Sequence, residues 1–207
     1  MQERKKTRLY ITLQHRGDKP GFHWALLLAP KSESANINTT HEYRFHALNT
    51  AQEGAVIGAN GQYEWRFEHQ AFNCLSTGNL IGRILVAKLS SSRGNRRGEG
   101  GKRHGDCSEL LSSQADRVRD IVETVPLVQN DDKWTCRAWV EQALAALRSA
   151  GGLDGEFATI PDVQVGGEVE RDIFAFGERA VEEIKTRKTA ITKVADLPHG
   201  DMRIVKK

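Results

Sequence analysis

The stretch Lys19–Pro30, KPGFHWALLLAP, is the most informative part of the sequence for the fold. A Pro-Gly turn signal precedes the apolar run Phe22–Ala29, and Pro30 ends it. A short apolar run between turn residues is typical of a buried β-strand. His23, near the start of the run, is an ionisable ring at the mouth of an otherwise apolar strand. We therefore expect a buried strand with a candidate functional histidine at its entrance.

Four further segments within the first 90 residues have the patterns of strands. TRLYITLQH (7–15) and HEYRFHALNT (41–50) alternate apolar and polar side chains, as half-buried strands do. GQYEWRFEHQAF (61–72) begins with an Asn-Gly turn signal, and NLIGRILVAKL (79–89) is a long apolar run expected in a central position. Five strands without a helical pattern between them predict a mostly antiparallel sheet.

The second half of the chain has helical periodicity. Apolar residues recur at spacings of three and four in 108–125, in 130–152 and in 168–185. We expect Asp131 or Asp132 to cap the second of these helices and a Gly-Gly pair to end it. The predicted fold is α+β: an antiparallel sheet of about five strands packed against a layer of about three helices. We expect a single domain spanning 1–207.

Composition excludes several classes of protein. The 207 residues suit one domain, and a net charge of +3 is too small by itself to indicate nucleic-acid binding. We expect a cytoplasmic protein, because the sequence has neither a membrane-spanning apolar run nor a secretory signal pattern. Cys74, Cys107 and Cys136 are odd in number and form no CxxC pair. We therefore expect no disulfide framework, no metal site and no cofactor.

Residues 90–106, SSSRGNRRGEGGKRHGD, interrupt the pattern of strands and helices. The segment combines five basic residues with five glycines and has no large apolar side chain, so we expect a flexible insert. It is either a solvated connection or a contact for a phosphate backbone, with RNA (tRNA) as the candidate partner through 93–103. The tail from about residue 186 has weak patterning and is expected to be loosely ordered.

Cys136 is the candidate nucleophile. Near the start of a helix, unpaired backbone N–H groups and the helix dipole favour an anion, which lowers the pKa of a thiol. A nucleophilic thiol also needs a base, and histidine suits that role near neutral pH. Cys136 is also in register with Val140, Ala143 and Leu147, so a buried structural cysteine is the alternative. The histidines expected at the surface are His15, His41, His69, His104 and His199.

The segments FHWALLLA, YRFHAL and WTCRAWVEQAL together resemble the circularly permuted papain-like group, which includes NlpC-type and lecithin–retinol acyltransferase-like enzymes. That group has an His-Trp-Ala strand, a second histidine on the next strand and a downstream cysteine that opens a helix. The resemblance implies that Cys136 is the nucleophile, His23 its base and His46 the group that orients the base. Where members typically show Asn-Cys-Glu-His, this chain has Thr135, Cys136, Arg137 and an alanine.

This resemblance implies a thiol-dependent acyl transferase or hydrolase that forms a thioester on Cys136. The backbone N–H of Cys136 is expected to contribute to an oxyanion hole. The substrate is expected to be a small-molecule or peptide acyl compound; the acyl donor is an amide, an ester or an aminoacyl-tRNA used to form a peptide bond. The alternative is a catalytically inactive papain-like module that binds a peptide or protein.

Overall fold

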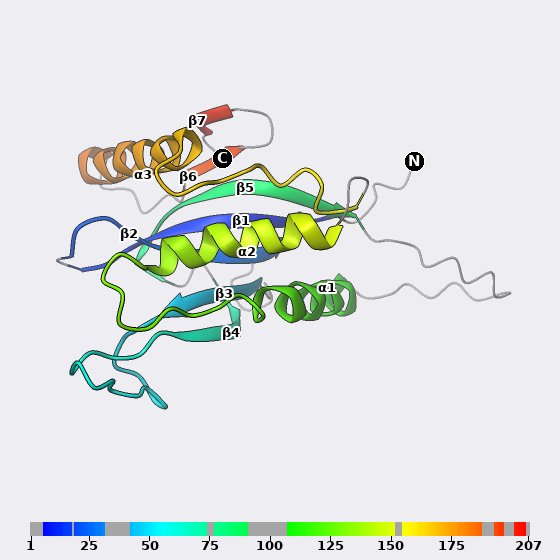
Figure 1. The fold of residues 1–207 in the computed structure, drawn as a ribbon. Coiled ribbons are helices and arrows are strands. Elements are labelled where there is room, and N and C mark those ends of the chain that lie inside the picture. Colours follow the sequence, from blue (N-terminus) through cyan, green and yellow to red (C-terminus); the bar gives the residue numbers. More distant parts are fainter. Residues whose placement is uncertain are drawn as a thin grey trace, which may run out of the picture.

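The computed structural model describes residues 6–17, 19–31, 42–73, 77–90, 107–151, 155–187, 193–196 and 201–205. The strands are β1 (Lys6–His15), β2 (Phe22–Pro30), β3 (Glu42–Leu48), β4 (Arg66–Phe72), β5 (Leu80–Ser90), β6 (Lys193–Asp196) and β7 (Asp201–Val205). The helices are α1 (Cys107–Val122), α2 (Cys136–Gly151) and α3 (Glu168–Arg187). Figure 1 shows the strands and helices in one α+β assembly.

One sheet contains the described strands, in the order β4-β3-β2-β1-β5-β6-β7. The five strands predicted from the sequence are antiparallel to one another where they pair, which confirms the predicted fold class. The tail adds two short strands that the sequence pattern did not predict: β6 pairs with β5 in parallel, and β7 pairs with β6. The turn between β1 and β2 uses Gly17 and Gly21 at φ 64° and 76°, a backbone region that favours glycine.

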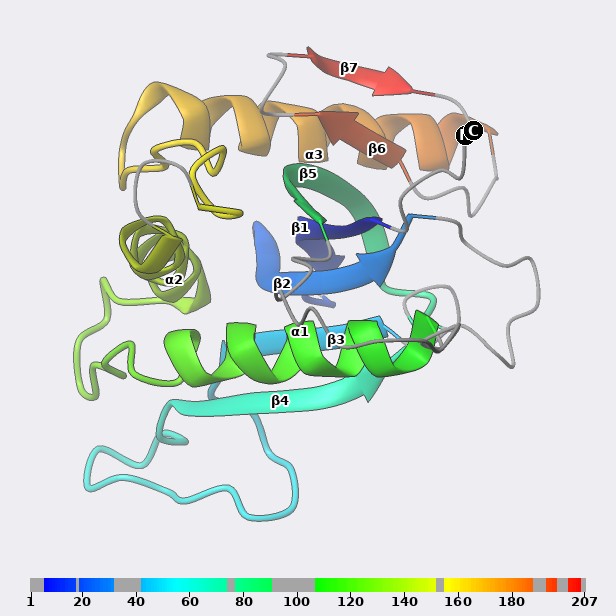
Figure 2. The same ribbon diagram turned by 90° about the vertical axis from the view of Figure 1, so that its right-hand side faces the viewer.

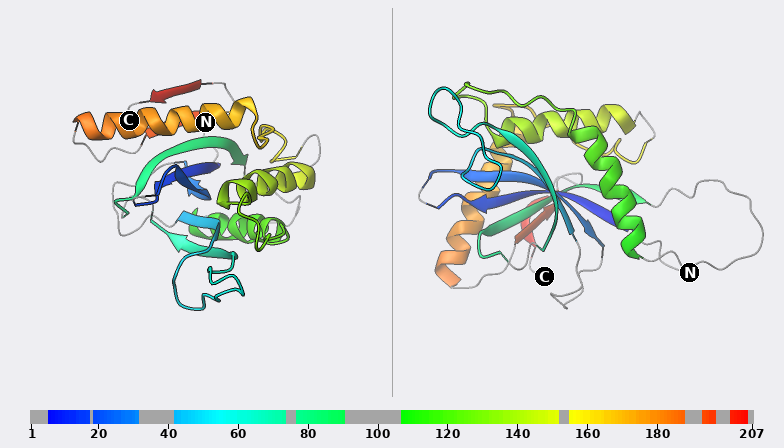
Figure 3. Two further views of the ribbon diagram at one scale, coloured as in Figure 1. Left: turned by 60° about the vertical axis from the view of Figure 1, so that its left-hand side comes forward. Right: turned by 90° about the horizontal axis from the view of Figure 1, so that it is seen from below.

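Both faces of β2 are buried, which explains its continuous apolar sequence. Trp24, Leu26 and Leu28 belong to the main core with the helices, whereas Leu27 and Ala29 belong to a smaller cluster on the other face. Helices α1 and α2 pack on β2 and β3, as Figure 2 shows. Helix α3 lies with β6 and β7 at the end of the sheet away from β4 (Figure 3).

The sheet curls toward its smaller core. Arg83 of β5 lies 3.6 Å from the carboxylate of Glu42 of β3, although β1 and β2 separate these strands in the sheet. The side chains of this pair are only 2% and 1% exposed, and the Arg83 guanidinium lies 5.2 Å from the ring centre of Tyr10. A flat sheet would keep β3 and β5 too far apart for such a contact, since neighbouring strands are about 4.8 Å apart.

The predicted cap of α2 is wrong, although the predicted location of Cys136 is confirmed. The side chain of Asp131 accepts the N–H of Lys133 at 2.9 Å, and its carbonyl accepts the N–H of Trp134 at 3.1 Å. These bonds close a turn that precedes the helix. Helix α2 itself begins at Cys136, and the carbonyl of Thr135 accepts the N–H of Trp139. The thiol therefore lies at the first residue of the helix.

Candidate active site

The structure brings two of the candidate residues into direct contact. His23 is near the start of β2 and His46 is on β3, so both side chains come from adjacent strands. Nε2 of His23 lies 2.8 Å from Nδ1 of His46, with the rings in an edge-to-face arrangement. The sequence-based expectation that one imidazole contacts the other is therefore confirmed.

Both imidazoles are neutral at neutral pH. Burial, followed by the charges of Arg44 and Arg16, lowers the pKa of His23 from 6.5 to about 4. Burial, and then the charge of Arg44, lowers the pKa of His46 to about 2. The hydrogen bond between the rings therefore joins two neutral groups, one of which donates its N–H.

Cys136 is 5% exposed and its sulfur lies against backbone N–H groups. Sγ accepts hydrogen bonds from the N–H groups of Trp24 and Arg137. Burial raises the pKa of the thiol, while the hydrogen bond from Trp24 and the charge of Arg16 lower it; burial has the largest effect, and the net shift is upward. The resting group is therefore a protonated thiol.

The thiol and the histidine pair lie on either side of the Trp24 peptide. Trp24 directly follows His23, and its indole packs in the main core together with Cys136. Side chains alternate along a strand, so the ring of His23 leaves β2 in the other direction and contacts His46. Among the described residues, no hydrogen bond joins Sγ to either imidazole. Catalytic hydrogen bonds often form fully only once a substrate is bound.

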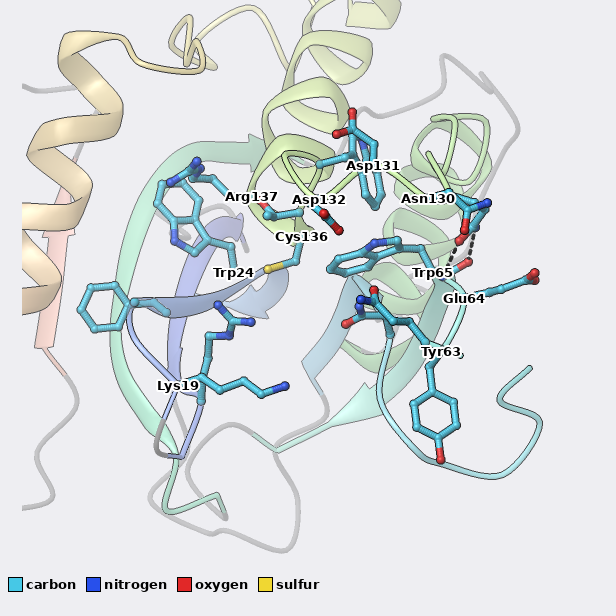
Figure 4. A pocket seen from close by; sticks show the side chains of 18 of the residues that line it. Lys19, Trp24, Tyr63, Glu64, Trp65, Asn130, Asp131, Asp132, Cys136 and Arg137 are labelled. Carbon is cyan, nitrogen blue, oxygen red and sulfur yellow. Dashed lines mark hydrogen bonds between the residues drawn. The ribbon is translucent and has the colours of Figure 1, made fainter. Parts of the chain in front are cut away.

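A cavity of about 560 Å³ opens in front of Cys136. Figure 4 shows Cys136 between Trp24 on one side and Trp65 on the other. Lys19 lies on the side of Trp24, whereas Asp132 lies on the side of Trp65 (Figure 4). The cavity therefore has both charged and aromatic walls around the thiol.

The far wall of this cavity is held by Gln129. Its side-chain amide accepts the N–H of Trp65 at 2.7 Å and donates to the carbonyl of Trp65 at 2.8 Å. The indole of Trp65 meets that of Trp134 edge to face, with ring centres 5.0 Å apart. Gln129 therefore ties the segment before α2 to the segment before β4. The sequence analysis did not identify this residue, because the two segments are far apart in the chain.

Arg137, the residue after the thiol, belongs to a buried ionic cluster between α2 and α3. Its Nε lies 2.6 Å from Oε1 of Glu170, and its guanidinium lies over the ring of Phe174. Oε2 of Glu170 accepts the N–H of Gly166 at 2.6 Å. Burial, followed by the charge of Glu170, raises the pKa of Glu141 to about 7. Only tertiary packing brings Glu170 to this site, so local sequence patterns did not reveal it.

His69 is not exposed at the surface, contrary to the expectation from the sequence. It is half-buried on β4, and its ring stacks on Phe45 and Tyr43 with centres 4.8 and 5.6 Å apart. His15 is exposed, as expected. The other three histidines expected at the surface lie outside the described residues, as do Cys74, the side chain of Cys107 and the basic insert.

The fold and site define an α+β protein with a cysteine at the start of a helix, near a hydrogen-bonded pair of histidines on adjacent strands. The chain belongs to DUF6914, a family of unknown function, which matches residues 6–96 and 112–164. These matched segments include His23, His46 and Cys136. Searches of curated proteins and of solved structures each gave no significant match. Within the described part of the chain, no helix is long and apolar enough to cross a membrane.

Proposed function

We propose that this protein is a thiol-dependent acyl transferase or hydrolase, with Cys136 as the nucleophile, His23 as the base and His46 as the orienting group. One observation carries the proposal. The sulfur of Cys136, at the first residue of α2, accepts a hydrogen bond from Trp24, the residue that follows the histidine contacting His46. The proposal therefore places the nucleophile, the base and the orienting group around the Trp24 peptide, with Cys136 and Trp24 among the residues that line the cavity.

In the proposed reaction, His23 takes the proton from Sγ as the sulfur attacks the substrate carbonyl carbon. The tetrahedral intermediate collapses to a thioester, and the departing amine or alcohol takes the proton from His23. Water or an acceptor amine or alcohol then attacks the thioester and gives its proton to His23. When the thioester breaks, this proton returns to Sγ. The N–H groups at the start of α2 favour the negative oxygen of each intermediate.

The electrostatics favour general-base catalysis over a preformed thiolate–imidazolium pair. Burial keeps the thiol protonated, and burial also keeps His23 neutral, with a pKa of about 4. The proton then moves during attack, as in the serine hydrolases. The proposal therefore predicts that the reaction rate falls on the acid side near pH 4, the pKa of His23, and not near the pKa of an ordinary histidine.

The acyl donor stays open between an amide, an ester and an aminoacyl-tRNA. Contact of tRNA with the basic insert 93–103 is part of this proposal as well, and it predicts binding that weakens as salt rises. A reducing compartment such as the cytoplasm suits an enzyme that works through a free thiol.

A second candidate, an inactive papain-like binding module, also has a specific observation in its favour. The side chain of Cys136 is nearly fully buried, and among the described residues its sulfur makes no hydrogen bond to an imidazole. A cysteine in that setting is ordinarily inert. In this alternative, the cavity binds a ligand and no thioester forms.

Alkylation of the folded full-length chain tests the proposal. Iodoacetamide labelling, followed by peptide mass spectrometry, gives a separate rate for each cysteine. We expect Cys136 to label fastest at neutral pH, and His23→Gln to slow it at least tenfold. The matched control His15→Gln changes an exposed histidine and is expected to leave the rate unchanged. Circular dichroism checks that both variants fold. Equal labelling of Cys136 in the parent chain and in both variants would favour the inactive module.

A further inference from the structure

Glu68 contacts the ring nitrogen of His46 that faces away from His23. It lies on β4 directly opposite His46 in the antiparallel register. Nε2 of His46 is 3.4 Å from Oε2 of Glu68, and among the described residues this nitrogen makes no hydrogen bond. His46 is only 4% exposed, and buried polar nitrogens ordinarily have a polar partner. The carboxylate is therefore the nearest available acceptor for an N–H at this position.

The position of Glu68 is itself fixed by its neighbours. Oε1 of Glu68 accepts a hydrogen bond from Nε of Arg66 at 3.2 Å. The terminal nitrogens of Arg66 donate to the carbonyl of Thr50 and to the side chain of Gln52, both at 3.0 Å. An arginine with three fixed partners holds the carboxylate beside His46. This network leaves Oε2 free to face the imidazole.

The order of these contacts favours one arrangement of the protons on the two rings. A carboxylate only accepts hydrogen bonds, so its position 3.4 Å away favours the tautomer of His46 that carries the proton on Nε2. Nδ1 of the neutral His46 is then an acceptor, and Nε2 of His23 must donate to it across 2.8 Å. The proton of the neutral His23 is therefore on Nε2, and its Nδ1 retains the lone pair.

We propose that Glu68 is a positioning residue that acts through His46 to keep the lone pair of His23 on Nδ1. This inference rests on the proposed function for its chemical meaning, because Nδ1 is the nitrogen of His23 that the contact with His46 leaves available to take a proton from Cys136. Removing the acceptor at Glu68 would free His46 to hold its proton on either nitrogen. His23 would then also populate the tautomer whose Nδ1 is protonated and cannot act as a base.

Nitrogen-15 NMR of the histidine rings in the full chain tests the inference directly, because it distinguishes the two neutral tautomers. His23→Gln and His46→Gln variants assign the signals. In the parent protein we expect both rings to be protonated on Nε2. Glu68→Leu removes the acceptor, and Glu68→Gln retains an acceptor oxygen of similar shape. Glu178→Gln on α3 is the matched control, since it changes an exposed glutamate far from the histidines.

We expect Glu68→Leu to produce mixed tautomers at His46 and to slow Cys136 alkylation several-fold. Glu68→Gln should keep both the tautomer of His46 and the alkylation rate of Cys136 near the parent values. A difference of this kind between the two Glu68 variants would not follow from a loss of stability alone. The inference is overturned if His46 in the parent chain carries its proton on Nδ1, or if Glu68→Leu leaves both tautomers unchanged. An unreactive Cys136 in the parent chain would overturn the proposed function, while the NMR result would still decide the role of Glu68.

Discussion

Lowering the pH from 7 to 5 should destabilise the fold through its two buried histidines. Burial lowers the pKa of His23 to about 4 and that of His46 to about 2, both below the ordinary value of 6.5. Below 6.5 the unfolded chain binds protons that the folded chain excludes, so stability falls as pH falls. Between pH 6.5 and pH 5, the free energy of unfolding therefore falls by about 2 kcal/mol for each histidine, or by about 4 kcal/mol for the pair. That is a large part of the 5–15 kcal/mol that typically separates folded and unfolded states.

Glu141 acts in the opposite direction over part of the same range. Its raised pKa, about 7, means that the folded chain holds a proton that the unfolded chain loses between about pH 4.5 and 7. The parent protein alone therefore does not isolate the histidine effect. The double variant His23→Gln/His46→Gln removes the histidine titration and leaves Glu141 unchanged. Subtracting its pH dependence from that of the parent chain cancels the contribution of the carboxyl group.

Urea unfolding of both proteins at pH 7 and pH 5 measures this difference. We expect the parent chain to lose about 4 kcal/mol more than the double variant on acidification. The slope of each transition should be compared first, because a changed slope would indicate a change in the unfolded state. Parallel pH dependence of the two proteins would refute the reasoning, since it would mean that His23 and His46 accept protons in the folded state as readily as in the unfolded chain.

Three further changes have outcomes that the structure defines. Gln129→Ala removes two hydrogen bonds to the backbone of Trp65 and should lower the free energy of unfolding, measured in urea, by about 1–3 kcal/mol. Tryptophan fluorescence should also shift, because Trp65 is held less firmly in the cavity wall. An unchanged spectrum and an unchanged urea midpoint would contradict the role of Gln129. Gly177→Ala should destabilise the folded protein by about 1–3 kcal/mol, although alanine has the better helix propensity, because the new Cβ would lie 2.5 Å from the ring of Phe22. A higher melting temperature of the variant would show that α3 packs less closely against Phe22. Glu141→Gln should make stability rise more steeply between pH 4.5 and 7 than it does in the parent chain, because the opposing titration of the Glu141 carboxyl is removed. Unfolding at several pH values measures this difference, and identical slopes would contradict the raised pKa of Glu141.

The strands β1–β5 were predictable because local sequence patterns mark them: alternation in some segments, continuous apolar runs in others, and turn residues between them. The structure pairs these five segments antiparallel, with β2 buried on both faces as its continuous apolar run requires. The contact between His23 and His46 followed from the expectation that their strands are neighbours. Glu68 was missed because its relation to His46 depends on the register of β3 and β4. A one-residue change in register would place its side chain on the other face of the sheet.

The start of α2 was predicted wrongly because the capping residue expected from the sequence forms a different turn. An aspartate before an amphipathic segment predicts a helix cap, yet Asp131 closes its own turn and the helix begins at Cys136. The cluster of Arg137 with Glu170 was unpredictable for a different reason. Its two members lie on separate helices, and only the packing of α3 against the sheet brings them together.

The family match ends at residue 164, so α3 lies beyond it, although α3 provides two of the groups around Arg137. A chain shortened to 164 would retain the thiol and both imidazoles, but Arg137 would lose the carboxylate of Glu170 and the ring of Phe174. Its guanidinium would then be free to swing across the mouth of the cavity. The thiol and the side chains that hold Arg137 at the cavity are thus encoded in separate portions of the polypeptide, and substitutions in α3 would reposition this guanidinium without altering Cys136, His23 or His46.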